Sequence, residues 1–93
     1  MQWTWNPAKA EANKRKHGVD FELAGHALGD PLALTVPDPC PHEERWRTLC
    51  MPAISSTVVL FVVHTWPDDE DNPGRIISAR EAELHERRIY EEG

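Results

Sequence analysis

The residue best suited to acid–base chemistry in this chain is His17, which follows Lys16 at the end of a basic segment. Histidine titrates near neutral pH, so His17 can donate or accept a proton in a reaction. The alternative is that His17 is a cation at the C-terminus of a helix, where it interacts favourably with the helix dipole. The sequence leaves both interpretations open.

Arginines in two later segments are suited to binding a phosphate, because the planar guanidinium group matches two phosphate oxygens. Arg45 and Arg47 are two residues apart, so both are expected on one side of a strand. Arg75 and Arg80 are five residues apart and point to opposite faces if their strand stays regular.

A C-terminal stripe begins at Arg80 and continues with Glu83, Arg87 and Tyr90 on one helix face. Glu83 and Arg87 are expected to form an i,i+4 ion pair, which contributes about 0.3–0.5 kcal/mol. One interpretation is therefore a solvated helix with a salt bridge. In the other, Arg80 binds a phosphate, and Tyr90 stacks on a base or relays a proton.

Other chemically able residues are better explained by packing. His64 shares a strand side with apolar residues 58, 60 and 62, which favours a place in the core or at its rim. Three tryptophans could stack on bases, but packing is the better explanation in a small core: Trp5, Trp46 and Trp66. The acidic residues 68–71 lack the spacing of a calcium loop, so we expect no metal and no cofactor.

Length and charge limit the class of protein. Ninety-three residues fit one domain, residues 1–93, and a chain with 40% hydrophobic residues has an ordinary globular composition. A formal net charge of −6 argues against a non-specific polyanion binder, so contact with nucleic acid would need a local basic patch. The apolar run 58–63 is too short for a membrane helix, and no signal peptide is visible. We therefore expect a cytoplasmic protein.

The order of elements predicts an α+β fold, with a small antiparallel β-sheet packed by two N-terminal helices and one C-terminal helix. Asn6-Pro7 is typical of a helix start and Gly18 of a helix end, which predicts a helix over 7–17. Asp20 is expected to cap a second helix. A short first strand is expected at the N-terminus, later strands over 32–36, 45–51, 58–65 and 75–80, and a last helix over 81–90.

Three blocks of residues follow one another along nearly the whole chain. The first block comprises Trp5-Asn6-Pro7-x-Lys9, Asn13, Lys16-His17-Gly18-Val19 and Phe21-Glu22-x-Ala24. The second comprises Asp30-Pro31 and Glu44-Arg45, and the third Arg75-Ile76-Ile77-Ser78-Ala79-Arg80-x-Ala82 followed by Glu86-Arg87-x-x-Tyr90-Glu91. Together they resemble the BrnT-type toxins of type II toxin–antitoxin pairs.

The resemblance implies a RelE-like fold and a metal-independent endoribonuclease that inhibits translation and growth until a BrnA-like antitoxin neutralises it. It also implies that the antitoxin carries the DNA-binding element, so the toxin reaches operator DNA only indirectly. The alternative function is a non-catalytic co-repressor subunit of that antitoxin-led complex. In either case the acidic balance of the chain favours a partner that offers basic residues.

RNA cleavage without a metal needs a base for the 2′-hydroxyl, an acid for the leaving 5′-oxygen and cations for the growing phosphorane charge. Arg45 and Arg80 fall inside the matched blocks and are the strongest candidates. The full predicted site has catalytic and RNA-binding members. The catalytic residues are His17, Arg45, Arg80 and Tyr90, and the RNA-binding residues are Lys16, Arg75 and Arg87.

Overall fold

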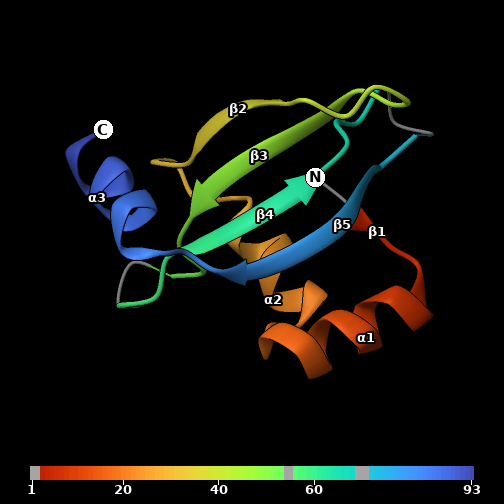
Figure 1. Ribbon diagram of the computed structural model, residues 1–93, viewed down its shortest axis with the longest axis horizontal. Coiled ribbons are helices and arrows are strands. Elements are labelled where there is room, and N and C mark those ends of the chain that lie inside the picture. The colour runs from red at the N-terminus through yellow and green to blue at the C-terminus, as the bar shows by residue number, and fades with distance from the viewer. Residues whose placement is uncertain (1–2, 54–55, 69–71) are drawn as a thin grey trace.

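The computed structural model describes residues 3–53, 56–68 and 72–93. Over these residues the chain forms five strands and three helices in the order β1 (Trp3–Thr4), α1 (Pro7–His17), α2 (Phe21–Ala27), β2 (Leu34–Asp38), β3 (Arg45–Cys50), β4 (Leu60–His64), β5 (Gly74–Glu81) and α3 (Leu84–Glu92). The strands form one sheet in the order β1-β5-β4-β3-β2. Figure 1 shows α1 and α2 together on one side of this sheet, away from α3. The α+β class is as expected.

The sheet is mixed, which corrects the expectation of a purely antiparallel one. β1 pairs with β5 in parallel through Trp3–Gly74 and Thr4–Arg75, whereas β2, β3, β4 and β5 pair antiparallel. The first strand pairs with the last strand rather than with the next strand in the sequence, and the two run in the same direction. Gly74 permits the pairing, because a Cβ atom at this residue would clash with the ring of Trp3.

Helix α1 has the predicted bounds and is fixed to the edge of β5. The Asn6 side chain accepts hydrogen bonds from two backbone N–H groups of the first turn, and Gly18 ends the helix at φ 73°. From the middle of α1, the buried Asn13 amide donates to the Ala79 carbonyl over 2.7 Å and accepts from the Ala79 N–H over 3.2 Å. The Asn13 amide thus supplies the hydrogen bonds that a neighbouring strand would give.

Helix α2 supplies most of the side chains that cover the sheet. Asp20 caps it by accepting a hydrogen bond from the Glu22 N–H, as predicted. The core lies between this helix and the inner face of the sheet. Its members are Val19, Phe21, Ala24, Ala27, Cys50, Leu60, Val62, Ile76 and Ala79.

Three elements begin later than predicted: β4, which begins at Leu60 rather than at residue 58, and β2 and α3, for which a local contact explains the difference. The strand expected over 32–36 is β2, shifted to Leu34–Asp38, because the Asp30 carboxylate holds the Leu32 N–H in a turn. β2 includes Pro37, which is tolerated because β2 is an edge strand. The last helix begins at Leu84 rather than at residue 81, after a capping box between Glu83 and Glu86.

A bulge in β5 decides where its arginines lie. Val63 pairs with Ser78, but the next residue, His64, pairs with Ile76, so Ile77 is an extra residue in β5. The condition of a regular strand is therefore not met, and Arg75 and Arg80 point to the same face of the sheet.

The outer face of the sheet, opposite α1 and α2, carries four arginines. Arg80 pairs across from Phe61, whose strand neighbours Leu60 and Val62 are buried in the core. Arg75 precedes the buried Ile76 and therefore points outward as well. We call this surface the arginine face, and its residues are Arg45, Arg47, Phe61, Arg75 and Arg80.

Candidate functional site

Arg80 is the most closely held residue of the arginine face. Its guanidinium carbon lies 4.1 Å above the centroid of the Phe61 ring. Nη1 and Nη2 donate to the two carboxylate oxygens of Glu86 over 2.8 and 2.9 Å, and Nη1 also donates to the Glu81 carbonyl over 3.2 Å. Groups from β5, β4 and α3 therefore hold the Arg80 guanidinium in place together.

This contact favours the charged form of both partners. The hydrogen bond from Arg80 holds the pKa of the Glu86 carboxyl below its usual value, and the same bond raises the pKa of Arg80. Arg80 keeps its Nε–H and one Nη2–H, which lie along a second edge of the guanidinium plane. No acceptor binds Nε in the part of the chain that the structure describes. That edge has the donor spacing that a phosphate accepts.

The other arginines of the face are also paired with carboxylates. Arg45 Nε and Arg75 Nη2 donate to the same Glu43 oxygen over 2.9 and 2.7 Å. Hydrogen bonds from Arg75 and then Arg45 lower the pKa of Glu43. Arg47 Nε donates to Asp38 over 2.6 Å. The structure thus brings Arg45 and Arg75 together, as part of a row of guanidinium groups that still reach solvent.

Tyr90 lies in α3 and contacts a different group. Its hydroxyl donates to Asp30 Oδ2 over 2.6 Å. Burial, and then this bond, raise the pKa of Tyr90 to about 12. The same carboxylate accepts from the N–H groups of Leu32 and Met51 over 2.9 Å each. Burial raises the pKa of Asp30, but the three hydrogen bonds outweigh it and the net direction is downward.

Asp30 therefore ties α3 to the ends of α2 and β3. The motif residues Asp30 and Tyr90, sixty positions apart, meet for this structural reason. A neutral phenol at physiological pH can donate a hydrogen bond but is a weak proton source.

The remaining predicted residues lie apart from these contacts. Arg87 Nε pairs with Glu91 over 2.9 Å and not with Glu83, because Glu83 precedes the helix and caps it; the expected Glu83–Arg87 pair is wrong. His17 and Lys16 are exposed at the end of α1. Within the described residues neither is hydrogen-bonded to the arginines of the sheet.

His64 is a core residue, as its pattern predicted. It is fully buried, and its Nδ1 donates to the Thr65 carbonyl over 2.9 Å. Since Nδ1 carries the proton, Nε2 accepts from Thr48 Oγ1 over 2.6 Å, and Thr48 in turn accepts from Thr35 over 2.8 Å. Burial lowers the pKa of His64, so the ring is held neutral.

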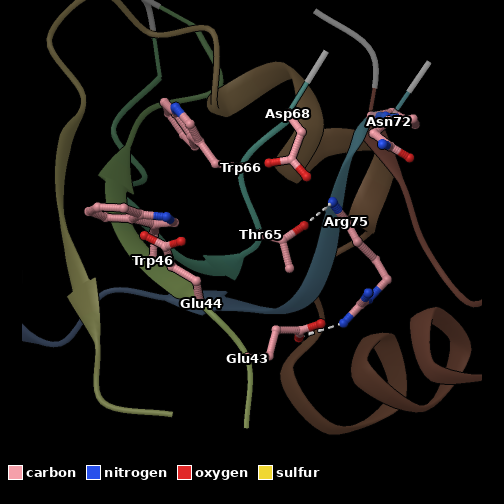
Figure 2. Close-up of a pocket in the computed structure, with 9 residues that line it drawn as sticks. Glu43, Glu44, Trp46, Thr65, Trp66, Asp68, Asn72 and Arg75 are labelled. Atoms are coloured by element: carbon pink, nitrogen blue, oxygen red, sulfur yellow. Dashed lines mark hydrogen bonds and ion pairs between the residues drawn. The ribbon is translucent and has the colours of Figure 1, made fainter. Parts of the chain in front are cut away.

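The tryptophans divide between packing and exposure. Trp5 meets the buried Phe21 edge-on, with ring centroids 6.2 Å apart, so the packing explanation holds for it. Trp46 and Trp66 line a pocket of about 370 Å³ at one end of the sheet. Figure 2 shows their rings on one side of that pocket and Arg75 on the other. The described residues that line it are Glu43, Glu44, Trp46, Thr65, Trp66, Asp68, Asn72, Pro73 and Arg75.

The described residues hold neither a metal-binding cluster nor a membrane-spanning helix. In residues 3–53, 56–68 and 72–93, no three histidine, cysteine, aspartate or glutamate side chains are grouped to hold a metal ion. Positions 69–71 of the acidic loop lie outside the described residues. None of the helices over the described ranges has the length and apolar character needed to span a bilayer.

Sequence reasoning missed several residues of the arginine face. Phe61 stood in an apolar strand, yet the alternation of that strand places it opposite the core. Arg47 was placed on the strand side of Arg45 from the sequence, but it was not included in the predicted site. Glu86 belongs to the third block of matched residues, beside Arg87, and that position was its signal in the sequence. The sequence does not show that it contacts Arg80.

Comparison with known proteins supports one family. A sequence model described as the ribonuclease toxin BrnT of type II toxin–antitoxin systems matches residues 5–86. No curated protein matches the chain. The matched range includes Arg80, Glu86 and the strands of the arginine face. Because it covers most of the 93 residues, the chain belongs to the BrnT family of ribonuclease toxins.

Proposed function

We propose that this toxin binds and cleaves RNA on the arginine face, with Arg80 as the phosphate-binding residue. One observation carries the proposal: Glu86 fixes the Arg80 guanidinium through two hydrogen bonds, while the second donor edge has no acceptor among the described residues. A guanidinium held in place before the substrate arrives stabilises developing charge with little reorganisation. Phe61, under the same group, supports it by a cation–π contact.

The proposed reaction needs no metal. The RNA 2′-oxygen attacks the neighbouring phosphorus, its proton passes to a base, and the bond to the 5′-oxygen breaks as an acid protonates that oxygen. Arg80 stabilises the negative charge on the phosphorane, and Arg45 assists from the neighbouring part of the face. The products are a 2′,3′-cyclic phosphate and a free 5′-hydroxyl.

The proton carriers stay predictions. His17 is the candidate because its imidazole can donate or accept a proton and the side chain is exposed, so RNA that crosses the β5 edge toward α1 could meet it. For Tyr90, a pKa of about 12 favours hydrogen-bond donation over proton relay at neutral pH. Lys16, Arg75 and Arg87 are proposed to contribute to RNA binding through their positive charge.

The finer family features also belong to this proposal. A RelE-like fold, a BrnA-like antitoxin, translation as the target and a cytoplasmic location fit a small α+β toxin. The co-repressor function remains the second candidate, because each arginine of the face is already paired with a carboxylate. Such pairing reduces the positive potential that RNA would meet.

Induction of the chain without an antitoxin tests the proposal. We expect growth arrest and loss of cellular RNA with the parent chain, and normal growth with Arg80→Ala. Arg88→Ala is the matched control, because it removes one exposed guanidinium of α3 and should leave arrest intact. Purified chain should also cleave RNA equally with and without EDTA. Normal growth with abundant folded parent protein would favour the co-repressor function instead.

A further inference from the structure

The pocket lined by Trp46 and Trp66 lies where β3 begins and β4 ends (Figure 2), and its chemistry differs from that of the arginine face. Its aromatic side is formed by Trp46 and Trp66, whose ring centroids are 6.4 Å apart with planes tilted by 49°. Trp66 is 49% exposed although it is a large apolar side chain. We call this cavity the tryptophan pocket, with the lining given above. Arg80 does not line it.

The tryptophan pocket is acidic. Among the described residues, three carboxylates line it, those of Glu43, Glu44 and Asp68, against one guanidinium, that of Arg75. Glu43 neutralises Arg75 through a 2.7 Å hydrogen bond, which leaves the charges of Glu44 and Asp68. Within the described residues, neither of these two carboxylates has an ion-pair partner. A phosphate would be repelled here.

Aromatic faces beside uncompensated carboxylates select cations. The face of an indole ring attracts a cation more strongly than other aromatic rings do, and carboxylates bind a guanidinium with two parallel hydrogen bonds. A guanidinium also stacks on aromatic faces, which an ammonium group does not, and it is more easily desolvated. We propose that the tryptophan pocket is a docking site for an arginine side chain of a protein partner.

Charge complementarity identifies the kind of partner. A chain of net charge −6 with an acidic aromatic pocket fits a segment that is basic and presents an arginine at its surface. Arginine and tryptophan are also the residues that most often dominate the binding energy of interfaces. In this family the antitoxin is the partner expected to supply that segment. Binding of an arginine in this pocket does not require RNA cleavage at the arginine face.

The test uses the full chain and the uncharged-ended peptide acetyl-Gly-Arg-Gly-amide, followed by NMR through the indole N–H signals. The matched control peptide carries citrulline, which has the shape of arginine without its charge. We expect saturable shifts of the Trp46 and Trp66 signals with the arginine peptide only. The Trp5 signal, which belongs to the core, should stay in place.

Two kinds of variant separate the pocket from general attraction to an acidic protein. Glu44→Gln combined with Asp68→Asn should lower the affinity for the arginine peptide by about fivefold or more. Glu22→Gln combined with Glu92→Gln changes the net charge equally at exposed sites elsewhere and should leave the affinity unchanged. Trp66→Leu should also weaken binding without any change of charge.

The signals of the core report folding in every variant, so a misfolded variant is recognised and the charge variants still decide. Equal shifts with the citrulline peptide would overturn the proposal, and so would equal weakening by both charge pairs. The absence of any shift at Trp46 and Trp66 would overturn it as well. RNA cleavage by the same preparations reports separately on the proposed function.

Discussion

The arginine face and the tryptophan pocket share one sheet but differ in the sign of their charge. The face presents four guanidinium groups against three carboxylates. The pocket shares Arg75 and Glu43 with the face, and its two other carboxylates, Glu44 and Asp68, have no ion-pair partner among the described residues. In each region an aromatic ring lies beside the charged groups, Phe61 under Arg80 and Trp66 beside Asp68. The net charge of −6 for the whole chain therefore describes neither surface.

Position on the sheet produces this division. The bulge at Ile77 directs Arg75 outward with Arg80, and the alternation of β3 adds Arg45 and Arg47 to the same side. Trp46, between those two arginines in β3, points to the other face. One strand therefore contributes cations to one region and an aromatic ring to the other.

The largest expected effect is on catalysis at the arginine face. Arg80→Ala should lower the rate of RNA cleavage by about 100-fold, the usual cost of removing one preorganised group that stabilises transition-state charge. Arg80→Lys keeps the charge but loses the fork, so it should also be strongly impaired. Rates are measured with purified chains on a single RNA.

The control for this prediction is Arg88→Ala, which removes the same charge from an exposed helix position. Its cleavage rate should match that of the parent. Thermal melting of each chain shows whether Arg80→Ala is folded. A folded Arg80→Ala chain with the parent rate would remove Arg80 from the site.

A smaller effect is expected where α3 is attached beside the arginine face. Tyr90→Phe removes the hydrogen bond to Asp30 and should lower the free energy of unfolding by about 1 kcal/mol. Because the phenol stays protonated at neutral pH, the cleavage rate should change little. Denaturant unfolding and cleavage are measured on the same sample. A large loss of rate with parent stability would instead make Tyr90 catalytic.

A few-fold effect is expected from the ring under Arg80. Phe61→Leu keeps an apolar side chain in β4 but loses the cation–π contact, so RNA affinity should fall by about two- to fivefold. Trp66→Leu, in the other region, should leave RNA affinity unchanged. Equal effects of the two substitutions on RNA affinity would contradict the assignment of RNA binding to the arginine face alone.

The smallest effect concerns pH and the buried ring next to the tryptophan pocket. Burial holds the pKa of His64 below its unfolded value, so the unfolded chain binds more protons when the solution is acidified. Stability should therefore be constant above about pH 7 and fall between about pH 6.5 and 5, before the carboxylates titrate. His64→Gln should reduce the dependence of the free energy of unfolding on pH in this range, measured by denaturant unfolding. An unchanged pH dependence would mean that other groups cause it.

Local signals in the sequence predicted the elements well where one residue fixes the backbone. The Asn6 cap and the Gly18 stop gave α1 its bounds, and Asp20 capped α2. The parallel pairing of β1 was not predictable in this way, because it depends on contact between Trp3 and Gly74 across the whole chain. The bulge in β5 likewise follows from the register with β4.

The site could be predicted only in part. Motif positions and residue chemistry singled out Arg45 and Arg80, both of which lie on the arginine face. Their partners Glu43 and Glu86 fix their orientation and offset their positive charge, and such pairs form only once the sheet and α3 are in place. The role of Asp30 as a shared acceptor for Tyr90 and two N–H groups was hidden for the same reason.

The most direct measurement is an NMR titration of the full chain with a short 2′-O-methyl RNA, which cannot be cleaved because its 2′-oxygen is blocked. The Arg80 Nε–H signal reports on the arginine face and the Trp66 indole signal on the tryptophan pocket. We predict that RNA shifts the Arg80 signal and leaves the Trp66 signal in place. A shift of Trp66 with no change at Arg80 would contradict the assignment of RNA to the arginine face.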